Sequence, residues 1–192
     1  MGVTYDNSEQ RFVFDFEHDG TEDIVSLTGD GYQVEAFGRC FYYGYEFSEQ
    51  VDGNVRSAFI KHVKFTEDLQ NNPDLTQFIK KAIDQLNRRV NLYDYNLVVM
   101  PESSSKVNQY MLRYIYRFAQ PKLCKVSDII GKKPNEDLCS TIRNQNILVM
   151  DDVTTSGSTL NEILHTLRIL SEDNEITIFS LIGRKDLMAE AT

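Results

Sequence analysis

Short apolar runs and amphipathic helical patterns alternate along the chain from about residue 96. Two segments repeat apolar residues at three- and four-residue spacing, as helices do: QYMLRYIYRFA (109–119) and TLNEILHTLRIL (159–170). Four segments around them are expected to form strands: NLVVM (96–100), KLCKVSDII (122–130), NILVM (146–150) and EITIFSLIG (175–183). This alternation predicts an α/β fold, with an open, mostly parallel sheet that is flanked by helices and joined by right-handed crossovers.

The first fifty residues follow a strand-like pattern instead. RFVFDF (11–16) alternates Phe with other residues, and VEAFGRCFYYGYEF (34–47) is rich in aromatic residues. Clusters rich in Gly and Asp separate these runs and indicate turns. We therefore expect residues 1–50 to form a β-rich N-terminal hood or subdomain.

Residues 51–192 are expected to hold helices followed by the α/β core, so that the whole chain makes one compact domain. The first helix is predicted within VRSAFIKHVKF (55–65), and the second starts near Pro73. Asn72 or Asp74 is the expected cap of this second helix, because short polar side chains accept hydrogen bonds from the free N–H groups of a first turn.

Two polar loops follow predicted strands directly: ESSSKVN (102–108) and DDVTTSGS (151–158). In open α/β sheets, ligands bind beyond the carboxyl ends of the strands. The second loop leads into a helix, so its backbone N–H groups and the helix dipole favour an anion. Gly157 permits a tight turn, and hydroxyls add donors at Thr154, Thr155, Ser156, Ser158 and Thr159. This pattern predicts a phosphate-binding loop, although it is not a Walker loop, since no GxxxxGK[ST] is present.

Asp151 and Asp152 would repel a phosphate placed directly on them. Just upstream of the phosphate, they would instead accept hydrogen bonds from sugar hydroxyls or hold a divalent cation. A ribose 5-phosphate unit with Mg²⁺ has this arrangement of groups. The alternative for the acidic pair is a helix cap with a turn, and ESSSK also reads as a plain polar loop.

The segment ILVMDDVTTSGSTL (147–160) resembles the signature of type I phosphoribosyltransferases, which is an apolar strand, two acidic residues and a Thr/Gly/Ser loop. The resemblance extends more loosely over residues 96–184. Within that family the chain looks closest to the ComF-like branch, through PESSSKVNQYMLRYI (101–115) and NVRSAFIKHVKF (54–65). The cysteine zinc motif of that branch is missing.

The resemblance implies the substrate 5-phosphoribosyl 1-diphosphate (PRPP) with Mg²⁺ as cofactor. It implies that Asp151 and Asp152 contact the ribose hydroxyls, directly or through water on the metal, and that Thr154 to Thr159 surround the 5-phosphate. A diphosphate-binding loop is implied at Glu102, Ser103, Ser104, Ser105 and Lys106. A mobile lid is expected at residues 131–145, where Lys132 and Lys133 would neutralise diphosphate charge, and Arg184 is a candidate contact for the acceptor.

The expected activity is therefore Mg²⁺-dependent transfer of the 5-phosphoribosyl group from PRPP to an acceptor, with a nucleobase or a similar nitrogen nucleophile expected in that role. A first alternative is a non-catalytic PRPP-binding regulator on the same fold. A second is a phosphohydrolase that uses Asp151 as nucleophile or metal ligand. The family also implies a homodimer.

Composition narrows the choice of partners and compartment. The chain has 192 residues and a formal net charge of −9, which disfavours general nucleic-acid binding. No apolar run approaches the length of a membrane span, and the N-terminus does not read as a signal peptide. Its three widely spaced cysteines predict reduced thiols and a cytoplasmic location.

Overall fold

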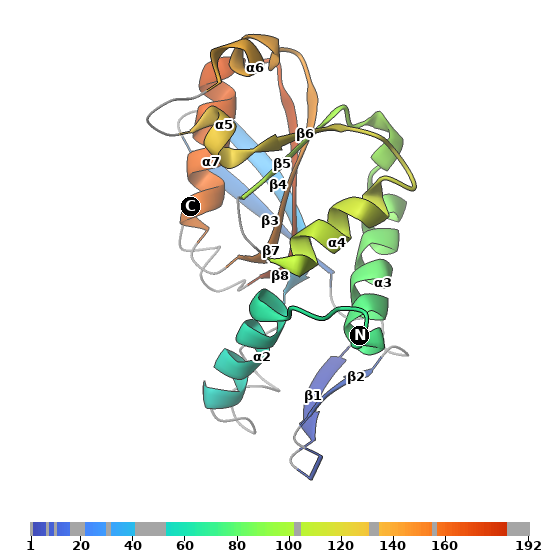
Figure 1. Ribbon diagram of the computed structural model, residues 1–192. Helices are drawn as coiled ribbons and strands as arrows, with labels where there is room; N and C mark the ends of the chain where they lie inside the picture. The colour runs from blue at the N-terminus through green and yellow to red at the C-terminus, as the bar shows by residue number, and fades with distance from the viewer. Residues whose placement is uncertain are drawn as a thin grey trace.

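The computed structural model describes nine stretches of the chain: residues 2–6, 8–9, 11–15, 22–29, 32–40, 53–101, 105–130, 135–154 and 157–183. Their main body is a six-stranded sheet with helices on both faces (Figure 1). Helices α2 (Gly53–Phe65), α3 (Pro73–Arg89) and α4 (Lys106–Ile115) pack on one face. On the other face lie α5 (Val126–Ile129), α6 (Glu136–Thr141) and α7 (Ser158–Leu170).

The sheet has the strand order β3-β4-β8-β7-β5-β6. Its members are β3 (Glu22–Gly29), β4 (Tyr32–Cys40), β5 (Leu97–Met100), β6 (Lys122–Lys125), β7 (Asn146–Thr154) and β8 (Glu175–Gly183). Strands β4, β8, β7, β5 and β6 run parallel, and β3 pairs antiparallel with β4 at the edge. The predicted open, mostly parallel sheet flanked by helices is confirmed.

Alternation along the central strands divides the core into two halves. Val98 of β5 and Leu148 of β7 belong to the half under α2, α3 and α4. Their neighbours Val99 and Val149 belong to the half under α5, α6 and α7. All four are fully buried, which explains why these strands read as continuous apolar runs rather than as alternating patterns.

Helix α3 begins where its sequence predicts. Asn72 is the cap, and its Oδ1 accepts a hydrogen bond from Leu75 N at 3.1 Å, with Pro73 in the first turn. Such a cap contributes about 1 kcal/mol. The apolar stripe of the helix, which includes Leu75, Phe78 and Leu86, is fully buried.

The N-terminal region is divided between two sheets. Strands β1 (Gly2–Asp6) and β2 (Arg11–Asp15) form an antiparallel hairpin of their own, whereas β3 and β4 belong to the main sheet. Residues 22–40 are therefore part of the core sheet, and the division expected near residue 50 does not separate the two sheets. Close pairing requires Gly38 of β4, because a Cβ there would lie 2.5 Å from the carbonyl oxygen of Ser180 in β8.

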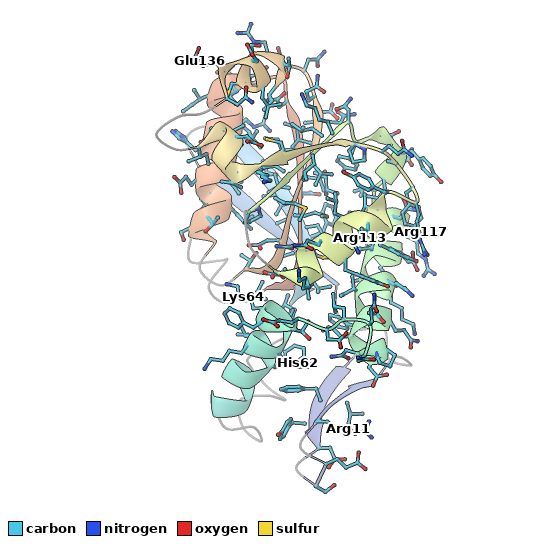
Figure 2. The ribbon with its side chains drawn as sticks, viewed as in Figure 1. Arg11, His62, Lys64, Arg113, Arg117 and Glu136 are labelled. Atoms are coloured by element: carbon cyan, nitrogen blue, oxygen red, sulfur yellow. The ribbon has the colours of Figure 1, made fainter. Side chains whose placement is uncertain are left out.

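His62 links the hairpin to the helices (Figure 2). Its ring lies 5.4 Å from that of Phe12 in β2, and its Nε2 lies 3.0 Å from Nδ2 of Asn72. Because Asn72 Oδ1 already accepts from Leu75 N, its Nδ2 faces the imidazole. Nε2 of His62 must therefore accept, so the ring is neutral with its proton on Nδ1.

Acid should destabilise this contact. Burial lowers the pKa of His62 below its ordinary value of 6.5. The unfolded chain therefore binds the proton first, and the contribution of His62 to folding stability should fall as the pH drops below about 6.5. We expect the unfolding midpoint of His62→Gln to rise relative to that of the parent when the pH is lowered from 7.5 to 5.5, since glutamine can accept the same hydrogen bond without titrating. Equal decreases in both proteins would contradict the assigned tautomer.

The connection from β6 to β7 differs from the sequence expectation. KLCKVSDII was expected to form one strand, but β6 ends at Lys125, where the Asp128 carboxylate accepts from Lys125 N at 2.9 Å and starts a helical turn. Residues 135–145 are anchored, because Leu138 and Ile142 are buried in the core. This packing does not favour a mobile lid over residues 135–145, and Lys132 and Lys133 lie outside the described residues. None of the described helices is long and apolar enough to cross a membrane.

Candidate functional site

The strand order predicts a ligand-binding crevice between β5 and β7. From β5 the chain crosses through α4 to β6 on one side, and from β7 it crosses through α7 to β8 on the other side. This reversal makes a topological switch point, and its carboxyl end is where open α/β sheets bind ligands. The described residues on either side of the two polar loops, Met100 and Ser105 after β5 and Thr154 and Gly157 after β7, therefore flank this switch point.

Asp151 and Asp152 lie within the end of β7, rather than after it as expected. Each carboxylate accepts a hydrogen bond from the next backbone N–H, at 2.9 Å for Asp151 and 2.7 Å for Asp152. Asp152 is completely buried, and its Oδ2 has no hydrogen-bond partner among the described residues. A buried carboxylate oxygen without a donor is costly, so this atom fits a ligand that supplies a hydroxyl or a cation.

The pKa of Asp151 is raised to about 7. Burial is the largest cause, and the neighbouring charge of Asp152 is the second. A hydrogen bond from the Asn108 side chain acts in the opposite direction. Near neutral pH the pair therefore carries less than its full negative charge, and a cation or hydroxyl donor would restore the ionised form.

The loop after β7 ends in a left-handed residue. Gly157 has φ of 75° and caps α7, where its carbonyl oxygen accepts from Asn161 N at 2.9 Å. Thr154 is buried, with no hydrogen-bond partner for its Oγ1 in the described part of the chain, whereas Ser158 and Thr159 are exposed in the first turn of α7. The sequence assignments at Thr155 and Ser156 lie outside the described residues.

The loop after β5 leads directly into α4. Ser105 is buried and caps this helix through a 3.4 Å hydrogen bond from Asn108 N. Lys106, expected in the loop, is instead the first residue of α4 and is exposed. Its N–H and those of the next residues point out of the helix start, which favours an anion there. Residues 102–104, which include the candidate diphosphate contacts Glu102, Ser103 and Ser104, lie outside the described residues.

Asn108 is a site residue that was not identified from its side chain. It is buried on α4 and hydrogen-bonds Asp151. The available signal was a polar residue at a helical position between the buried Val107 and Met111. Arg184, the candidate acceptor contact, lies outside the described residues.

The donor set fits Mg²⁺ only in part. Carboxylate oxygens are ligands that Mg²⁺ prefers, and Asp151 and Asp152 supply them. Within the described ranges, however, no group of three or more His, Cys, Asp or Glu side chains could hold a metal ion. Most ligands of a bound Mg²⁺ would then come from substrate and water, as is common for this ion.

No protein-family model matches the sequence, and no curated protein matches it either. Three solved phosphoribosyltransferase structures are similar at low identity. A hypoxanthine-guanine-xanthine phosphoribosyltransferase is 15% identical, with a TM-score of 0.43 over 58% of this chain and 63% of that one. An HGPRT-ase from Leishmania tarentolae is 15% identical, with a TM-score of 0.37 over 57% and 66%. A hypoxanthine phosphoribosyltransferase from Staphylococcus aureus is 16% identical, with a TM-score of 0.43 over 65% and 76%.

This chain therefore spans less than two thirds of the length of the first two of these proteins.

Proposed function

We propose that this protein is a Mg²⁺-dependent phosphoribosyltransferase, which transfers the 5-phosphoribosyl group of PRPP to a nitrogen nucleophile, such as a nucleobase, and releases diphosphate. One observation carries the proposal. The acidic pair at the end of β7, the left-handed Gly157 before α7 and the start of α4 after β5 meet at the switch point of the sheet. The resemblance of residues 147–160 to the type I signature assigns a ribose 5-phosphate to such a site.

The residues after β7 would bind the ribose 5-phosphate. The 5-phosphate would lie against the backbone N–H groups at the start of α7, where the helix dipole adds favourable charge and Gly157 leaves room for close approach. The ribose hydroxyls would donate to Asp151 and Asp152, and so supply a partner for the buried Oδ2 of Asp152. Fixing both ends of the sugar would orient C1 for attack.

The start of α4 would stabilise the leaving diphosphate. Its free N–H groups, held in place by the Ser105 cap, face the crevice end of β5, and Lys106 adds a positive charge. When bound, Mg²⁺ would further neutralise the diphosphate charge. Lys132 and Lys133 are proposed to contribute when substrate is bound, and substitution of both by alanine should then lower turnover.

A screen for diphosphate release tests the enzyme against its alternatives. With PRPP and Mg²⁺, we expect release only when a suitable base is added from a panel of purines and pyrimidines. Release without any acceptor would instead favour a phosphohydrolase. Tight PRPP binding with no release for any acceptor would favour the regulator, which is the second candidate function on this fold.

A homodimer, a cytoplasmic location and membership of the ComF-like branch remain proposals.

A further inference from the structure

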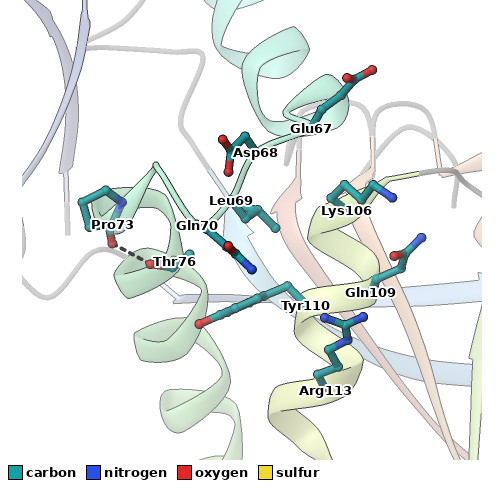
Figure 3. Close-up of a pocket in the computed structure, with 10 residues that line it drawn as sticks. All are labelled: Glu67, Asp68, Leu69, Gln70, Pro73, Thr76, Lys106, Gln109, Tyr110 and Arg113. Carbon is teal, nitrogen blue, oxygen red and sulfur yellow. Dashed lines mark hydrogen bonds between the residues drawn. The ribbon is translucent and has the colours of Figure 1, made fainter.

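A pocket lies between α4 and the connection from α2 to α3, and it shares Lys106 with the candidate site (Figure 3). It has a volume of about 570 Å³, within the range of small-molecule sites. One wall is α4, with Lys106 and Arg113, and the other is the connection from α2 to α3, with Glu67 and Asp68. The ring of Tyr110 extends from α4 toward α3 between the two walls.

The α4 wall offers two cations. Lys106 and Arg113 are seven residues apart, so they lie on the same helix face about 10 Å apart along the axis. Neither makes a salt bridge within the part of the chain that the structure describes, where the ion pair present is Arg11 with Glu9. Long side chains at this spacing can converge on one anionic group.

The opposite wall carries two carboxylates, and one of them already accepts hydrogen bonds. Oδ1 and Oδ2 of Asp68 accept hydrogen bonds from the backbone N and the side-chain Nδ2 of Asn71, at 3.2 Å and 2.5 Å. Glu67 is exposed at the pocket rim. The pocket therefore presents two cations on one side, an aromatic ring in the middle and one available carboxylate on the other side.

We propose that this pocket binds a nucleoside monophosphate. The phosphate lies between Lys106 and Arg113, the base packs against Tyr110, and N–H donors of the base face Glu67. The choice of a nucleotide among phosphorylated compounds rests on the proposed function, because the reaction would produce one. Lys106 then contributes to both sites. A nucleotide bound in the pocket would therefore compete for the positive charge that Lys106 offers to the diphosphate.

Calorimetric titration with GMP tests this assignment, because guanine carries two adjacent N–H donors. We expect saturable binding to the parent, and affinity reduced at least about tenfold in Arg113→Gln. Arg117→Gln removes the same charge just beyond the end of α4, outside the pocket, and serves as the matched control, with unchanged affinity expected. Glu67→Gln should weaken GMP but strengthen ribose 5-phosphate, which has no base to bind the carboxylate.

Two results would overturn the proposal. One is no GMP binding to the folded parent at millimolar concentration. The other is binding that is lost in Gly157→Val but retained in Arg113→Gln, since the nucleotide would then occupy the crevice between β5 and β7. If GMP binding depends on Arg113 while Mg²⁺–PRPP does not bind at all, the pocket assignment stands and the proposed function fails.

Discussion

Gly157→Val is expected to lower the affinity for Mg²⁺–PRPP by about a hundredfold or more. At φ of 75°, Gly157 has a conformation that a β-branched side chain adopts only with strain. The added side chain would also occupy the space where the phosphate approaches the start of α7. Loss of two charge-assisted hydrogen bonds, at roughly 1.5–3 kcal/mol each, accounts for an effect of this size. Calorimetric titration measures it directly.

The control for Gly157→Val must separate backbone strain at positive φ from obstruction of the phosphate by the added side chain. Asn144 also has positive φ, at 51°, and lies before the amino end of β7, at the opposite end of that strand from the site. Asn144→Val should therefore lower folding stability by about 1–2 kcal/mol through backbone strain, as Gly157→Val should, while leaving the affinity for PRPP unchanged. Parental affinity in Gly157→Val would show that the phosphate-loop assignment is wrong.

Asp151→Asn is expected to stabilise the ligand-free protein at pH 8 by about 1–2 kcal/mol, or roughly 2–8 °C in the unfolding midpoint. The folded-state pKa of Asp151, about 7, is above its ordinary value of 3.8. The native state therefore retains a proton that the unfolded chain releases, and the carboxyl group destabilises the fold as the pH rises from about 4 to 7. Asparagine removes that charge and keeps an oxygen that can accept from Asp152 N.

Two comparisons test this second prediction. At pH 5 Asp151 is protonated in the folded protein but ionised in the unfolded chain, so the stabilisation should fall to less than half of its value at pH 8, and it should vanish only below about pH 4. Asp173→Asn, an exposed aspartate in the turn before β8, should have little effect at either pH. Stabilisation together with lost ligand binding would mark Asp151 as a residue kept for function at a cost in stability. A less stable Asp151→Asn protein at pH 8 would show that the buried pair is structural.

The strand-and-helix pattern was enough to predict the core of this fold. Strands β5 and β8 and helix α7 begin and end close to the predicted positions, because each has a continuous apolar run or stripe and a recognisable end. Helix α3 and strand β7 begin where predicted, but β7 continues to Thr154 through the acidic pair. The addition of β3 and β4 to the main sheet was not predicted, because pairing between β4 and β8 joins residues about 140 positions apart. Local periodicity carries no information about such pairing.

Only part of the candidate site was predicted, because local sequence patterns do not reveal contacts between distant residues. The acidic pair and Gly157 are contiguous in sequence, so their pattern was visible. Asn108 reaches Asp151 only because α4 packs beside β7, and a side-chain contact of this kind depends on tertiary structure. The end of β6 at Lys125 was missed because it depends on one hydrogen bond, from Lys125 N to the Asp128 carboxylate, while β-branched residues continue to Ile130.

The most direct measurement is calorimetric titration of PRPP with Mg²⁺ into the parent and into the double variant Asp151→Asn, Asp152→Asn. We predict saturable binding to the parent, strengthening from pH 6 to pH 8 as Asp151 ionises, and binding that is lost or much weakened in the double variant. Equal affinity in both proteins, or no binding to a folded parent, would contradict the assignment of a ribose 5-phosphate site to the end of β7.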